Sequence, residues 1–132
     1  MNAVEKYLFE VHGYLVIEGV LTPEEVAAAN AAIDAHADRI IIRPNDLAHE
    51  SQTLQGAQGR GDLSGMLEWE KPYCEPFRAM IAHDKFKLYL EEVLGPGFRL
   101  EGLGIITMVE GAEGFWFHEG GEPHDRSRAF HY

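Results

Sequence analysis

Histidines and carboxylates are interleaved in the last fifteen residues of the chain. Three of its seven histidines fall there, and the six side chains are His118, Glu119, Glu122, His124, Asp125 and His131. Imidazole with carboxylate suits iron, zinc or copper, and two histidines with one carboxylate leave coordination positions open for oxygen and a substrate. The spacing leaves a second interpretation open, in which these are ordinary surface and loop side chains.

No other residue type in the chain offers a comparable pattern. Cys74 is the single cysteine and has no Cys-x-x-Cys partner, so we expect a small buried hydrophobe rather than a nucleophile. It cannot form an internal disulfide, which makes a reducing cytoplasm the expected compartment. The remaining carboxylates are scattered at helix starts and on solvated faces, without a pair set apart for acid and base work.

Length and charge limit the function classes. The chain has 132 residues and a formal net charge of -11, which suits one compact domain and argues against nucleic acid and anionic membrane surfaces. The longest apolar runs, such as residues 40–42, are far shorter than the roughly 20 residues of a membrane-spanning helix. We therefore expect a single soluble domain over residues 1–132 that binds neither nucleic acid nor membranes.

The first half of the chain reads as a strand, a helix and a loop. Residues 10–17 combine β-branched and aromatic residues around Gly13, which predicts a short strand. Thr22 as N-cap and Pro23 at the first helical position predict a helix from Glu24 to about Ala37. Residues 43–65 are rich in Gly, Ser, Asn and Gln, so we expect a flexible loop there.

The second half changes from helical to strand periodicity. Phe77, Met80 and Ile81 indicate one helix, and residues 86–94 a second one that ends at Gly95. Residues 98–109 alternate with period two, which predicts one or two strands. We expect a turn over residues 110–114 and a further strand that begins at Phe115. The result is an α+β chain, helices first and strands last, whose short sheet has edges that something must cover. We expect the sheet to be incomplete.

Two stretches resemble the phytanoyl-CoA dioxygenase family of non-haem iron, 2-oxoglutarate-dependent oxygenases. The first is "FEVHGYLVIEGVLTPEEVAAANAAID", residues 9–34, and the second is "HDKFKLYLEEVLGPGFRLEGLGIITMVEGAEGFWFHEGG", residues 83–121. The resemblance covers most of the chain apart from the loop at 43–65. It implies N-terminal helices packed on the first strands of a double-stranded β-helix, or jelly roll, with Fe(II) and 2-oxoglutarate as cofactors.

The same resemblance aligns His118 with the first metal histidine of the family. The sequence departs from the family at Gly120, where the carboxylate ligand is expected, and Glu119, Glu122 or Asp125 are candidates to replace it. The family's distal metal histidine and its 2-oxoglutarate-binding arginine lie on later strands, and Arg126, Arg128 and His131 come too soon to take those roles. His118 is therefore the one metal ligand that the resemblance assigns.

These observations predict a hydroxylase-like protein of this family. We expect this chain to be inactive by itself. Its substrate in a complete relative is a small molecule. The alternative is a non-catalytic, degenerate homologue that acts as an oligomeric or ligand-binding module, with a second copy covering the open sheet edge. A third hypothesis is a small cupin-like metal hydrolase that uses His118, His124 and Asp125 with zinc.

Overall fold

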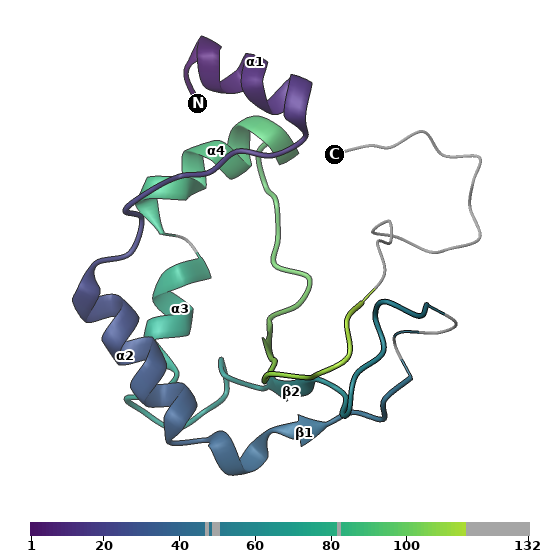
Figure 1. Cartoon of the computed structure of the whole chain (residues 1–132). Helices are drawn as coiled ribbons and strands as arrows, with labels where there is room; N and C mark the ends of the chain where they lie inside the picture. Colours follow the sequence, from purple (N-terminus) through teal and green to yellow (C-terminus); the bar gives the residue numbers. More distant parts are fainter. Residues whose placement is uncertain (47, 49–50, 82, 116–132) are drawn as a thin grey trace. The chain divides into compact units, whose positions relative to one another are not determined.

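The computed structural model describes residues 1–46, 48, 51–81 and 83–115. Its elements, in chain order, are α1 (Ala3–His12), α2 (Pro23–Asp34), the 3-10 turn η1 (Ala37–Arg39), β1 (Ile41–Ile42), β2 (Gly61–Ser64), α3 (Glu75–Ile81), α4 (Asp84–Leu94) and β3 (Gly104–Thr107) (Figure 1). Helices with a small antiparallel sheet make an α+β fold, as the periodicities predict. The described residues form two compact units: a helical unit of residues 1–35 and 66–102, and a sheet unit of residues 36–65 and those from 103 onward.

Helix α1 occupies part of the segment in which we expected a strand. The Asn2 side chain accepts hydrogen bonds from the N–H groups of Val4 (3.0 Å) and Glu5 (2.9 Å), and the Glu5 carboxylate accepts one from the Asn2 N–H (2.7 Å). This capping box starts the helix, and Gly13, at φ 75°, ends it. The predicted strand over residues 10–17 is therefore wrong, because Gly13 closes a helix instead of opening a strand.

Helix α2 begins as the sequence predicts. Thr22 Oγ1 accepts a hydrogen bond from the Glu25 N–H (3.2 Å), and Glu25 Oε2 accepts one from the Thr22 N–H (2.7 Å), with Pro23 at the first helical position. The helix ends at Asp34 and not at Ala37, and the turn η1 follows it. Helix α2 packs against α3, and its buried residues are Ala29 and Ala32.

Helices α3 and α4 confirm that the second half of the chain contains the two predicted helices, although α4 has no buried residue. The Phe77 ring of α3 is buried and meets Trp69 edge-on, with 5.5 Å between the ring centroids. The Arg78 guanidinium donates two hydrogen bonds, of 2.9 and 2.6 Å, to the Leu67 carbonyl and so holds the preceding turn against α3. Cys74 is buried with 1% of its surface exposed, which confirms its assignment as a small core residue.

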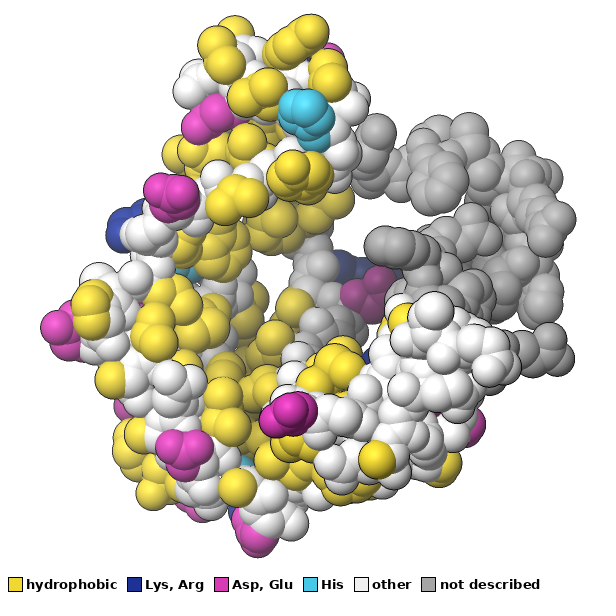
Figure 2. Space-filling view, viewed as in Figure 1, with side chains coloured by type: hydrophobic (Ala, Val, Ile, Leu, Met, Phe, Trp, Pro, Cys, Tyr) yellow, Lys and Arg dark blue, Asp and Glu magenta, His cyan; other side chains and the backbone are white. Residues whose placement is uncertain are grey.

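Helix α1 is held to α4 by two polar contacts. Lys6 Nζ lies 2.8 Å from Glu92 Oε1, and the Tyr89 hydroxyl donates to Glu5 Oε1 at 3.1 Å. Helix α1 has no buried residue, and its apolar side chains Val4, Tyr7 and Val11 are exposed. Figure 2 shows hydrophobic side chains on the surface of this helix. Polar contacts between exposed side chains contribute little to stability, so this contact is weak in comparison with the packing of α2 on α3.

The sheet unit contains an antiparallel sheet in the order β1-β2-β3. Ile41 pairs with Asp62 across β1 and β2, while Asp62 pairs with Ile106 and Leu63 with Ile105 across β2 and β3. Strand β2 lies inside the segment that we expected to be a loop, so that expectation fails for residues 61–64. The strand carries Gly61 because a Cβ there would collide with side chains of Ile40 and Thr107.

The last predicted strands are shorter than expected. Of residues 98–109, only Gly104–Thr107 form a strand. Residues 110–112 form the predicted turn, and Phe115 lies outside any strand, while residues 116 and 117 are not among those described.

No helix in the described ranges is long and apolar enough to cross a lipid bilayer. The single-domain prediction for residues 1–132 stays a prediction.

Candidate functional site

The predicted metal ligand His118 lies outside the described residues. The same holds for Gly120 and for the other members of the C-terminal cluster, which are Glu119, Glu122, His124, Asp125 and His131. What the structure does show is how the chain is held immediately before this cluster, up to Phe115.

Residues 111–115 are bonded to the glycine-rich segment 54–58 of the sheet unit. The Ala57 N–H donates to the Gly111 carbonyl, the Glu113 N–H to the Gln58 carbonyl and the Gly114 N–H to the Leu54 carbonyl, all at 2.8 Å. Residues 58 and 112 form a parallel bridge. We call residues 54–58 and 111–114 together the paired segments. The glycine-rich loop is therefore a structural partner of the chain that leads toward His118.

Glu113 adds a side-chain contact to the paired segments. Its side chain is 1% exposed, and Glu113 Oε2 accepts a hydrogen bond from the Ala48 N–H at 3.1 Å. A buried carboxylate is costly unless bonds or charges replace its lost hydration, and the Ala48 N–H supplies one such bond here. Glu113 thus joins residue 48 to the segment that follows β3.

The first residue of the aromatic run, Phe115, is contacted from β2 and its neighbours. The Arg60 guanidinium carbon lies 5.8 Å from the centroid of the Phe115 ring, within the range of a cation–π interaction. Asp62 fixes Arg60 from the other side, with 2.9 Å between Arg60 Nε and Asp62 Oδ1, and Arg43 Nη1 lies 3.5 Å from Asp62 Oδ2. Arg43 and Arg60 therefore both form ion pairs with Asp62 within the sheet unit.

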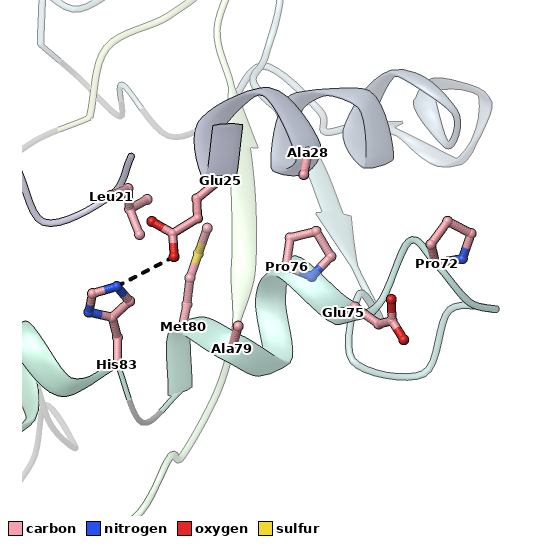
Figure 3. A pocket seen from close by; sticks show the side chains of 9 residues that line it. All are labelled: Leu21, Glu25, Ala28, Pro72, Glu75, Pro76, Ala79, Met80 and His83. Carbon is pink, nitrogen blue, oxygen red and sulfur yellow. Dashed lines mark ion pairs between the residues drawn. The ribbon is translucent and has the colours of Figure 1, made fainter. Parts of the chain in front are cut away.

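The helical unit contains a pocket of about 340 Å³. Helix α2 supplies two of its lining residues and α3 four, while Leu21 and His83 lie at one end and Pro72 at the other (Figure 3). The lining residues are Leu21, Glu25, Ala28, Pro72, Glu75, Pro76, Ala79, Met80 and His83. Most are apolar, so the pocket offers hydrophobic walls with few polar groups.

A carboxylate and an imidazole face each other at one end of this pocket. His83 Nε2 lies 3.7 Å from Glu25 Oε1 (Figure 3). The Thr22 backbone N–H, by donating to the Glu25 carboxylate, is the main cause that holds the pKa of Glu25 below its ordinary value, and His83 and Lys85 act in the same direction. Burial acts the other way and is outweighed. Glu25 is therefore ionised at neutral pH.

The sequence contains local signals for parts of this pocket. Thr22 and Glu25 are visible as a capping box, and His83 stands where the helical pattern is interrupted. The His83 side chain caps α4 by accepting from the Lys85 N–H at 3.3 Å. What the sequence could not show is that α2 lies against α3, because that contact joins residues about fifty positions apart.

The comparison with protein families decides the identity of the chain. The family model described as phytanoyl-CoA dioxygenase matches residues 9–103, which is most of the chain. The chain belongs to the phytanoyl-CoA dioxygenase family. Comparisons with curated proteins and with solved structures found no match.

Membership of the phytanoyl-CoA dioxygenase family confirms the resemblance read from the sequence. The match includes all of the first stretch, residues 9–34, and the second stretch as far as Leu103. It ends one residue before β3, so His118 lies beyond the matched residues. The metal-ligand role of His118 thus stays a prediction that depends on the second stretch.

The family generally depends on Fe(II) and 2-oxoglutarate, so the described residues can be tested for fit to a metal. Among residues 1–46, 48, 51–81 and 83–115, no three His, Cys, Asp or Glu side chains lie together as a metal site would need. The buried polar residues there, His36 and Glu113, both have bonding partners within the protein. The described part of the chain does not fit Fe(II) by itself, and its visible contribution is a scaffold.

Proposed function

We propose that the chain builds the N-terminal helices and opening jelly-roll strands of an Fe(II)- and 2-oxoglutarate-dependent hydroxylase. The family match over residues 9–103 carries this proposal. Enzymes of this kind use the metal and the cosubstrate to activate O2 and hydroxylate an aliphatic carbon of a small molecule, while the protein supplies ligands and a dry pocket. The single cysteine favours the reducing cytoplasm as the compartment.

The polypeptide of these 132 residues should have little or no hydroxylase activity by itself. Gly120 stands where the family carries its carboxylate ligand, and one imidazole cannot hold iron in the usual geometry. The first test adds Fe(II) and 2-oxoglutarate anaerobically and records the visible metal-to-ligand band. We expect no band, and a band that saturates at micromolar concentrations contradicts the proposal of an incomplete site.

A gain-of-ligand experiment tests the role of His118 directly. The Gly120→Asp variant restores the His-x-Asp pair, so its affinity for Co(II), used as a spectroscopic probe of an iron site, should rise by about tenfold or more. The double variant His118→Ala/Gly120→Asp is the matched control and should lose this gain. A gain that survives removal of the imidazole contradicts the assignment of His118 as a metal position.

A second candidate function, a non-catalytic oligomeric module, is favoured by the surface of the sheet unit. Ile41 and Ile106 pair with Asp62 from opposite sides, and Ile41, Ile106 and Met108 all have more than half of their surface exposed. Exposed apolar side chains on a sheet whose outer strands β1 and β3 have no further strand partner among the described residues suit coverage by a second copy. Light scattering after size exclusion should then give a dimer that Ile106→Lys converts to monomer, whereas a monomeric parent chain excludes this function.

A further inference from the structure

The pocket between α2 and α3 has mostly apolar walls, with Glu25 and His83 at one end and Glu75 on the Pro72 side. Its apolar lining consists of Leu21, Ala28, Pro72, Pro76, Ala79 and Met80. A volume of about 340 Å³ is at the small end of the range for pockets that bind organic molecules. The apolar walls therefore suit a short hydrocarbon body, and the Glu75 carboxylate, on the Pro72 side of the pocket (Figure 3), is paired with Lys71 at 3.2 Å.

His83 presents a hydrogen-bond donor at the polar end. Its Nδ1 accepts from the Lys85 N–H at 3.3 Å, which leaves Nε2, the atom that faces Glu25, as the ring's N–H donor. The ring is held in this orientation by stacking on Phe86, with 5.6 Å between centroids and 9° between planes. The donor therefore has a fixed position.

Glu25 presents an acceptor beside that donor. One of its oxygens, Oε2, is occupied by the Thr22 N–H at 2.7 Å, which leaves Oε1 toward His83. Lys85 Nζ donates a hydrogen bond to the Gly19 carbonyl at 2.7 Å, and its charge favours the ionised form of Glu25. An ionised carboxylate oxygen and an imidazole N–H thus stand next to each other at the end of an apolar pocket.

The 3.7 Å between His83 Nε2 and Glu25 Oε1 determines which chemical group fits there. It exceeds the length of a good N–H···O hydrogen bond, about 2.7–3.2 Å, but one oxygen atom can lie at bonding distance from both. A hydroxyl accepts and donates at the same time. A carboxylate has no proton to give Glu25 and repels it, and an ammonium has no lone pair for the His83 N–H.

We propose that this pocket binds a neutral aliphatic alcohol, with its hydrocarbon body between α2 and α3 and its hydroxyl between His83 Nε2 and Glu25 Oε1. The site lies within the helical unit, and its residues take no part in the proposed iron chemistry. Success or failure of this proposal is therefore independent of the hydroxylase function.

The test is a titration of the full 132-residue chain, labelled with ¹⁵N, with 1-hexanol. Two ligands of the same chain length, hexylammonium and hexanoate, change only the head group. We expect saturable shifts of the His83 ring nitrogens and of the amides around the pocket with hexanol, and at least about tenfold weaker binding of the two charged ligands, because each leaves a polar group unpaired. Equal or tighter binding of either charged ligand overturns the proposal, as does the absence of a saturable shift with hexanol.

Two alanines on α2 provide a matched pair of variants. Ala28 lines the pocket, whereas the exposed Ala27 beside it does not. Ala28→Leu fills the pocket and leaves Glu25 and His83 unsubstituted, so it should remove hexanol binding, and Ala27→Leu should keep it. Unchanged hexanol binding in folded Ala28→Leu places the alcohol elsewhere and refutes the proposed site.

Discussion

Gly56 lies so close to the backbone of Glu113 that a Cβ atom at position 56 would collide with it. The collision involves the main-chain atoms of Ala112 and Glu113, which cannot move aside as a flexible side chain can. The glycine is needed here for close approach, because the paired segments are joined by main-chain hydrogen bonds. The glycine-rich loop therefore has a packing role in the sheet unit.

The Gly56→Ala variant should loosen the paired segments. We expect a loss of about 1–3 kcal/mol in the free energy of unfolding of the sheet unit, since added volume in a tight contact forces the backbone apart. Hydrogen exchange of the Glu113 and Gly114 amides measures this loss of stability in the paired segments. Gly102→Ala is the control, because a Cβ there has nothing within 4 Å, and should change stability by less than about 0.5 kcal/mol. Equal protection in both variants would contradict the packing role of Gly56.

Removal of the Glu113 carboxylate should destabilise the same region. Glu113→Ala leaves the Ala48 N–H without the acceptor that it has at 3.1 Å, which costs about 1–3 kcal/mol for a buried group. Glu113→Gln keeps an acceptor oxygen and should lose less. Urea unfolding of the two variants gives the comparison, and a glutamine variant that is less stable than the alanine variant is inconsistent with this role.

Acid should weaken the start of α2. The pKa of Glu25 is lowered in the folded chain from its ordinary value of 4.5, chiefly by the Thr22 N–H. A lowered folded pKa means that the contribution of Glu25 to stability is complete above pH 4.5 and disappears as the pH falls through the folded value. Carboxyl NMR titration should show Glu25 titrating below the ordinary range. The Thr22→Ala variant removes only the hydroxyl cap, so the depression should largely persist.

The contact between α1 and α4 should appear in the titration of Tyr89. Its pKa is raised from the ordinary value of 10.0, first by the hydrogen bond to Glu5, with burial and the Glu5 charge acting in the same direction. The Glu5→Gln variant should therefore lower the pKa of Tyr89 toward 10.0, as followed by NMR of labelled tyrosine. The contribution of the contact to stability is present below pH 10.0 and is lost as the pH rises through the folded value. An unchanged Tyr89 titration in Glu5→Gln would show that the two side chains are not bonded.

Helices with strong local signals could be predicted from the sequence. Thr22 and Pro23 start α2, and Gly95 ends α4, because caps depend on residues within one turn of each other. The error at α1 has a local cause as well. The apolar residues after Gly13 favour a strand by their composition, whereas Asn2 and Glu5 form a capping box of the same kind as that of α2 and start a helix.

The sheet and the sites could not be derived in the same way. Strand β2 has a glycine and an aspartate among its four residues, and it is a strand because Leu63 and its neighbours pair with β3, far along the chain. The pocket between α2 and α3 likewise depends on the packing of these two helices, which are far apart in the sequence. For His118 the family resemblance remains the basis of its assignment, since the position lies outside the described residues.

The pairing of β2 with β3 has a consequence for synthesis on the ribosome. Gly61 pairs with Thr107, and α3 and α4 are translated between them. A nascent chain that has not yet reached residue 104 therefore carries β2 with one of its two edges unpaired, and such an edge is prone to association with other chains. Slow translation of the α3–α4 region should increase co-translational aggregation, and binding of a chaperone to residues 61–64 during that interval should prevent it.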